Sequence, residues 1–179
     1  MGKSSKDHRW LSPNGEEWDS RFEFQVYESI HNSGQAPVRR CTKDKRKESD
    51  TLVYTMPVRD ASCDACKSTE VSKRRTYTPD LYSPDAYGRD DRVYSHAGFY
   101  IEIKGYLRAD QRALLRAFCK ARPDIDLRIV FQRDFKVGSG TATSWVSKYL
   151  KRPCCIWKGR LPEEWVSARS TDNAAIQAV

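Results

Sequence analysis

The sequence predicts an α/β domain in which helices flank a mixed β-sheet. Two observations carry this prediction. Residues 99–104 alternate β-branched or aromatic with polar side chains, which is typical of a strand. Residues 110–122 then show helical apolar spacing up to Pro123, and a second apolar strand follows at 127–133. This succession of strand, helix and strand is the repeating unit of α/β folds.

The first helix is expected at residues 20–32. Phe22, Val26 and Ile30 recur every four residues, and Gly34 follows as a stop. Residues 1–19 are polar and predict a flexible N-terminal arm, whereas residues 167–179 have no pattern and predict a disordered tail. Residues 20–166 are then a single domain, which is an ordinary size for a chain of 179 residues.

Between the first helix and the central strands, the chain is rich in charge. Residues 38–50 predict a solvated loop. The more specific alternative is a segment that contacts the phosphates of a nucleic acid. Residues 52–58 predict a short strand, which Pro57 places at an edge or outside the sheet. An insert at about 59–76 follows, with the basic residues Lys73, Arg74 and Arg75 at its end.

The insert contains Cys63 and Cys66, two candidate zinc ligands in a Cys-x-x-Cys pair. A structural zinc site needs four ligands, so another cysteine or histidine, or a second chain, would have to complete it. Free surface thiols are the alternative. The six cysteines are expected to be reduced, because no signal segment opens the sequence and the cytoplasm of a host cell is the expected compartment.

The strand at 99–104 carries the candidate chemistry. Glu102 and Lys104 point to one of its faces, and Phe99, Ile101 and Ile103 to the other. A short strand at 77–81, containing Asp80, would pair with it through the loop 83–97. Two carboxylates at one point can hold a hard divalent cation, and a nearby lysine can orient or activate a water molecule. The alternative for Glu102 and Lys104 is a solvated ion pair on an exposed face.

The rest of the sequence predicts a helix with one basic face, followed by a few short helices and strands near the C-terminus. Arg112, Arg116 and Lys120 recur every four residues and form a cationic stripe opposite the apolar face. This stripe would contact either a DNA backbone or water alone. Residues 138–140 predict a flexible link. A helix capped by Thr143 or Ser144 and running to about Lys151, a strand at 154–158 and a helical turn at 162–165 complete the domain.

Net charge narrows the class of partners. Lys and Arg together number 32 against 24 Asp and Glu, a net charge of +8, which favours nucleic acid and other polyanions. The sequence has no apolar run of 18 residues, so no membrane span is expected.

Several motifs occur in the order of a known family: Tyr-Thr-Pro-Asp at 77–80, Glu-x-Lys-Gly at 102–105, a basic helix ending at Pro123, the strand at 125–131 and Leu-Pro-Glu-Glu-Trp at 161–165. This series resembles the bacteriophage endonuclease I family of Holliday-junction resolvases, which belongs to the restriction-endonuclease-like superfamily with the PD-(D/E)xK signature. The resemblance spans about residues 20–165.

The resemblance implies a restriction-endonuclease-like fold and a Mg²⁺-dependent or Mn²⁺-dependent deoxyribonuclease that cuts four-way junctions. It implies catalytic roles for Glu23, Asp80, Glu102 and Lys104, with Asp80, Glu102, the Ile103 carbonyl and Glu23 holding two metal ions. Glu23 also follows Ser20 in a Ser-x-x-Glu capping box, which is its structural alternative.

The resemblance further implies an interwound homodimer, in which Glu23 of one chain serves the site of the other. Two other interpretations stay open. One is a restriction-like or transposon-type nuclease that cuts unbranched duplex. The other is a zinc-stabilised DNA-binding module without catalytic activity.

Overall fold

The computed structural model describes residues 10–13, 15–34, 38–41, 51–59, 70–84 and 98–166, and it has the predicted α/β architecture with a mixed sheet. The central sheet has five strands in the order β11-β8-β7-β6-β3. Its parallel part is β7 (Phe99–Lys104), β8 (Leu127–Phe131) and β11 (Cys154–Ile156). The antiparallel part adds β6 (Leu81–Ser83) beside β7 and β3 (Arg39–Arg40) at the edge.

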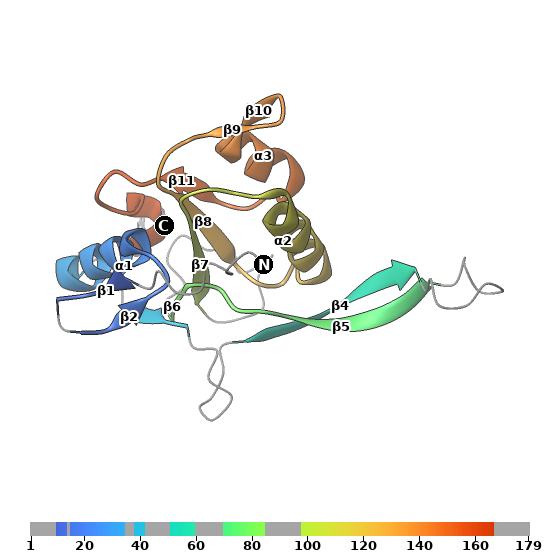
Figure 1. Cartoon of the computed structure of the whole chain (residues 1–179), viewed down its shortest axis with the longest axis horizontal. Helices are drawn as coiled ribbons and strands as arrows, with labels where there is room; N and C mark the ends of the chain where they lie inside the picture. Colours follow the sequence, from blue (N-terminus) through green and yellow to red (C-terminus); the bar gives the residue numbers. More distant parts are fainter. Residues whose placement is uncertain are drawn as a thin grey trace, which may run out of the picture.

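Four helices in the described residues cover the sheet (Figure 1). The pair α1 (Arg21–Ser33) and α4 (Glu163–Val166) contributes to one apolar cluster, and the pair α2 (Ala109–Ala121) and α3 (Ala142–Tyr149) contributes to the other. Strand β8 is buried on both faces, because Ile129 packs in the α2 cluster and Val130 in the α1 cluster. Two-sided burial is typical of a central parallel strand. None of the helices in the described residues has the length and apolar character needed to cross a membrane.

The N-terminal segment differs from the expected flexible arm. Strands β1 (Trp10–Leu11) and β2 (Glu17–Trp18) form a small antiparallel hairpin against α1. The Trp18 ring is 2% exposed and contacts the rings of Phe24 and Tyr27 on that helix. The two tryptophans give this polar segment an apolar contact area that anchors it. Residues 1–9 and 167–179 lie outside the described residues.

A long two-stranded ribbon leaves the body of the molecule. Strand β4 (Leu52–Arg59) pairs antiparallel with β5 (Glu70–Tyr77) over eight residue pairs. Figure 1 shows the ribbon extending beyond α2, away from the central sheet. Pro57 is therefore outside that sheet, as predicted. Residues 70–76 of the expected insert at 59–76 belong to β5, so Lys73, Arg74 and Arg75 lie on a strand.

Three smaller boundaries also differ from expectation. The strand expected at 77–81 is divided, because β5 ends at Tyr77 and β6 begins at Leu81, with Pro79 unable to donate a backbone hydrogen bond between them. The expected link at 138–140 is the turn of a hairpin formed by β9 (Lys136–Val137) and β10 (Gly140–Thr141). Helix α3 begins earlier than predicted, since Thr141 is its N-cap.

Candidate active site

Asp80 is held against the central strand by its own backbone and side chain. Its N–H donates to the Ile101 carbonyl at 3.1 Å, and its Oδ2 accepts a hydrogen bond from the Ile103 N–H at 2.6 Å. The carboxylate is thus fixed beside β7 before any ligand arrives, which lowers the cost of ordering it on binding. Ile103 thus contacts the site through its backbone N–H, while the metal-ligand role of its carbonyl stays a prediction; its apolar side chain packs in the α1 cluster.

Glu102 and Lys104 reach the same point from β7, because alternate residues of a strand share a face. The Lys104 ammonium contacts Glu102 Oε1 and lies 3.7 Å from Asp80 Oδ2. The side chain of Lys104 is 17% exposed and that of Glu102 only 6%. This burial excludes the alternative of a solvated ion pair on an open face.

Glu23 joins these three residues from the first turn of α1. Its N–H donates to Ser20 Oγ at 3.1 Å, so Ser20 is the helix N-cap as predicted. The Glu23 carboxyl shares a hydrogen bond with the Asp80 carboxyl. The predicted spacing therefore serves both interpretations at once: the backbone of Glu23 is capped, and its side chain enters the site. All four groups meet within the one chain that the structure describes, and the exchange of Glu23 between two chains stays a prediction.

Burial makes the negative charges of this cluster unfavourable. Burial is the main cause that raises the pKa of Asp80 to about 7, and the Glu23 charge adds to it while Lys104 opposes it. Burial and the Asp80 charge likewise raise the pKa of Glu102 to about 7. The pKa of Glu23 is also raised, mainly by burial. Burial lowers the pKa of Lys104, but Glu102 and Asp80 outweigh it, so the pKa of Lys104 lies above its usual value.

The four groups line a cavity of 670 Å³ between α1, β7, α2 and the start of the ribbon. Asp19 and Gln111 stand among its polar walls, and Leu114 and Leu115 form an apolar wall on α2. Leu114, one of the apolar residues of α2, is 40% exposed and borders this cavity. The cavity gives a polar ligand access to carboxylates that are otherwise withdrawn from water.

The carboxylates fit a hard cation better than a caged structural metal. Among the described residues, no group of three or more acidic, histidine or cysteine side chains forms a ready metal cage. Mg²⁺ does not require one, since it is usually held by one or two carboxylates together with water and substrate phosphate. Glu102 Oε2, moreover, is buried without a hydrogen-bond partner. Asp80 and Glu102 would hold such an ion, with Glu23 beside Asp80.

The predicted cationic stripe of α2 does not face this cavity as a unit. The Arg112 guanidinium donates to the Leu107 carbonyl at 2.8 Å. Arg116 and Lys120 are exposed and line a separate hollow of 450 Å³ beside Tyr149 and Lys151. Arg116 also stacks on the Tyr149 ring at 4.8 Å. Arg116 and Lys120 are therefore available to a polyanion next to α3, in a hollow separate from the carboxylate cavity.

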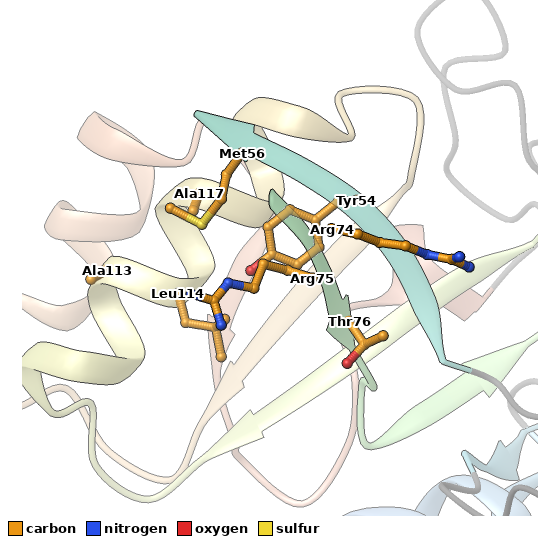
Figure 2. A pocket seen from close by; sticks show the side chains of 8 residues that line it. All are labelled: Tyr54, Met56, Arg74, Arg75, Thr76, Ala113, Leu114 and Ala117. Carbon is orange, nitrogen blue, oxygen red and sulfur yellow. The ribbon is translucent and has the colours of Figure 1, made fainter. Parts of the chain in front are cut away.

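The basic residues of β5 lie closer to the site. Lys73, Arg74 and Arg75 are exposed, and a groove of 510 Å³ separates the ribbon from α2. Figure 2 shows Tyr54 and Met56 directed toward α2 in this groove, with the Arg75 side chain reaching toward Leu114 and the Arg74 side chain extending away from the helix. Thr76 and Leu114 line both this groove and the carboxylate cavity, so the two hollows are adjacent.

The zinc prediction lies outside the described part of the chain, because Cys63 and Cys66 are not among its residues. Among the described residues, Cys41, Cys119, Cys154 and Cys155 form no disulfide. Burial is the main cause that raises the pKa of Cys119, Cys154 and Cys155, which keeps these thiols protonated at neutral pH.

Sequence reasoning missed one polar residue of the site. The Tyr77 ring is buried against Phe118, and its hydroxyl lies beside the Glu102 carboxylate. Tyr77 opens the Tyr-Thr-Pro-Asp motif, but a tyrosine at the end of a strand is most often a packing residue, so the pattern alone gave it no role.

Comparison of the chain with protein-family models, with curated proteins and with solved structures found no match.

Proposed function

We propose that this protein is a metal-dependent endonuclease of the restriction-endonuclease-like superfamily, and that it cuts four-way junctions and other branched DNA. The observation that carries the proposal is the convergence of Glu23, Asp80, Glu102 and Lys104 on one cavity. The sequence order Pro-Asp, then Glu-x-Lys, is the superfamily signature. Lys104 contacts both Asp80 and Glu102 in the structure, although more than 20 residues separate Asp80 from Glu102 and Lys104 in the sequence.

Three carboxyl groups share a single ammonium in this cluster. Such an imbalance is unfavourable for folding, because each uncompensated buried charge costs free energy. A divalent cation would balance it, with Mg²⁺ or Mn²⁺ as the candidates and one or two ions per site. When bound, the ion would stabilise charge on the attacking and leaving oxygens of a phosphodiester during in-line displacement.

The residues of the chain supply orientation and charge. Asp80, fixed by the Ile103 N–H through one oxygen, would present its other oxygen toward the ion, and Glu102 would present its carboxylate to the same cavity. Lys104 would move from Glu102 toward the incoming phosphate or the attacking water once a cation neutralises the carboxylates. Because the pKa of Lys104 is raised, the proposal assigns it the role of a cation and donor, not of a general base.

Branched DNA as substrate is proposed from the resemblance together with charge and symmetry. A net charge of +8 and the exposed Lys73, Arg74 and Arg75 favour a phosphate backbone. A four-way junction has approximate two-fold symmetry, so a homodimer with one site per chain would place two nicks. The ribbon projects from the body and is the proposed element that reaches the partner or the DNA arms (Figure 1).

The test compares cleavage of a four-way junction with cleavage of linear duplexes of the same arm sequences, in Mg²⁺ and in EDTA. We expect paired nicks in the junction in Mg²⁺ alone. Glu102→Gln should bind the junction in a gel-shift assay without cutting it. Equal cleavage of the linear duplexes would favour the unbranched-duplex nuclease, whereas binding without Mg²⁺-dependent cleavage by the wild-type protein would favour a DNA-binding module.

A mixing experiment decides whose Glu23 serves each site. Glu23→Gln and Asp80→Asn are each expected to be inactive. Co-refolded mixtures regain nicking only if Glu23 acts across the dimer, because one site of the mixed dimer then contains both wild-type residues. With Glu23 acting within its own chain, as the described contacts have it, every site carries one defect and the mixture stays inactive.

A further inference from the structure

The base of the ribbon and the metal-binding strand meet at two buried polar atoms. The Tyr77 hydroxyl and Glu102 Oε2 are both buried, and neither makes a hydrogen bond of full geometry to the described residues. The two side chains nevertheless lie within hydrogen-bonding range, because a hydrogen bond between them adds to the rise in the pKa of Tyr77 and opposes the rise in the pKa of Glu102. Tyr77 is 6% exposed and Glu102 4% exposed, so both groups are largely withdrawn from bulk water.

Packing fixes the Tyr77 ring in this position. Its centroid lies 4.4 Å from that of Phe118 on α2, and Tyr77 pairs with Leu52 at the base of the ribbon. A phenylalanine would make the same ring contacts without burying a hydroxyl. An unpartnered buried hydroxyl costs free energy, so packing alone favours phenylalanine and gives no reason for the oxygen. The oxygen lies beside a carboxylate that is proposed to bind metal.

We infer that Tyr77 is a positioning residue of the metal site, whose hydroxyl donates a hydrogen bond to Glu102 Oε2 and turns the carboxylate so that its Oε1 faces the cation. A small rotation of the Glu102 carboxylate joins the two unpartnered atoms in one O–H···O⁻ bond. Hydrogen bonds of this kind from outside the ligand set orient ligating carboxylates, and their loss typically weakens metal binding by about tenfold or more. The inference rests on the proposed function, because it concerns the cation held by Glu102.

The position of Tyr77 in the chain extends this role. Tyr77 is the last residue of β5, four residues after Lys73, and Arg74 and Arg75 lie between them. The same strand therefore carries the basic surface proposed to meet DNA and the hydroxyl that orients Glu102. No other segment in the described part of the chain joins these two features through a single strand.

The test measures Mn²⁺ binding to the full-length protein by isothermal titration calorimetry, in the absence of DNA. Tyr77→Phe should raise the Mn²⁺ dissociation constant about tenfold. Tyr54→Phe is the matched control, because it removes a hydroxyl from the same ribbon next to the same Phe118 ring, and Tyr54 lines the groove but is not among the residues that line the carboxylate cavity. We expect its Mn²⁺ affinity to stay within about twofold of wild type.

Two further measurements separate a positioning role from packing. Glu102→Gln should abolish the measured Mn²⁺ binding. Adding Tyr77→Phe to Glu102→Gln should then leave Mn²⁺ binding unchanged, and it should alter the melting temperature no more than Tyr77→Phe alone does. Metal-free Tyr77→Phe should melt no lower than Tyr54→Phe. A lower melting temperature than the control, together with weaker binding, would assign the effect to packing and overturn the inference.

The outcomes also separate this inference from the proposed function. If wild type and Tyr77→Phe bind Mn²⁺ equally while Glu102→Gln does not, the role of Tyr77 is refuted and the metal site stands. If wild type binds no Mn²⁺ through Glu102, the metal site and the role of Tyr77 are refuted together.

Discussion

Two clusters of buried charge lie on the central sheet, and they differ in how their charges are balanced. Asp126 and Arg128 form a pair that is 1% exposed on each side. Arg128 Nη2 donates to Asp126 Oδ2 at 2.7 Å, and Arg128 Nε donates to Oδ2 at 3.1 Å and to Oδ1 at 3.3 Å. The guanidinium also stacks over the Phe99 ring at 3.8 Å. One cation meets one anion, and both carboxylate oxygens are bonded.

The candidate active site has the opposite balance. Glu23, Asp80 and Glu102 share Lys104, and Glu102 retains an unpartnered oxygen. Both clusters are nearly withdrawn from water, so burial alone does not separate them. The balance of charge does: a closed pair leaves no buried charge uncompensated, whereas an excess of carboxylates prepares a place for a cation that the chain itself does not supply.

The largest effect is expected from removing one of the excess charges. Asp80→Asn keeps an oxygen that can accept from the Ile103 N–H but removes the negative charge, so Mg²⁺-dependent nicking of supercoiled plasmid should fall at least about a thousandfold. The melting temperature of the metal-free protein should not fall. Asp19→Asn is the control, since Asp19 lies exposed at the same cavity and should alter nicking by no more than about threefold. Nicking by Asp80→Asn within tenfold of wild type would contradict the proposed site.

Breaking the closed pair of Asp126 and Arg128 should lower the stability of the protein and leave its catalysis unchanged. Arg128→Met leaves Asp126 buried without its cation, so the free energy of unfolding in urea should drop by about 3–5 kcal/mol. Arg108→Met breaks the exposed pair with Asp110 and should cost at most about 1 kcal/mol. Nicking per folded molecule should be similar to wild type in both variants. An Arg128→Met protein as stable as Arg108→Met would show that the buried pair contributes little.

The excess of carboxylates also predicts how stability depends on pH. The pKa values of Asp80 and Glu102 are raised to about 7, from ordinary values near 4 in the unfolded chain. Between pH 4 and 7 the folded protein therefore binds more protons than the unfolded one, and this part of its stability is lost as the pH rises through 7.

Asp80→Asn removes part of this titration. In EDTA, its free energy of unfolding relative to wild type should rise by on the order of 1–2 kcal/mol from pH 4.5 to pH 7.5. Mg²⁺ at pH 7.5 should stabilise wild type and leave Asp80→Asn unchanged. The measurement is urea unfolding at both pH values. A difference between the two proteins that does not change with pH would show that Asp80 titrates normally.

The central sheet and the acidic site were predictable for the same reason. Phe99 to Lys104 alternates as a strand must, and alternation alone places Glu102 and Lys104 on one side. Sequence reasoning failed where a contact overrides local pattern. The residues of β5 up to Arg75 show no alternation of apolar and polar side chains, because this strand pairs only with β4 and is not covered by a core. The sequence therefore did not reveal that they form a strand.

Arg128 was given no role from the sequence. In the structure it is buried by Asp126, Phe99 and Trp165. Asp126 stands two residues earlier, and this spacing places both side chains on the same face of an extended chain. An acid and an arginine at that spacing in an otherwise apolar strand are a usable signal for a buried pair. Tyr77, by contrast, carries no signal at all outside the three-dimensional contact with Glu102.

The smallest expected effect separates the two roles at the start of α1. Ser20→Ala removes the hydroxyl that accepts the Glu23 N–H, so the free energy of unfolding should fall by about 1 kcal/mol while nicking is unchanged. Glu23→Gln keeps the cap and removes the charge beside Asp80, so it should lower nicking and leave the melting temperature equal to wild type or higher. Thermal unfolding and plasmid nicking of the two variants, measured side by side, check this. If Ser20→Ala lowered nicking as much as Glu23→Gln, Glu23 would act chiefly through the helix end, and the excess of carboxylates would shrink to the two that contact Lys104.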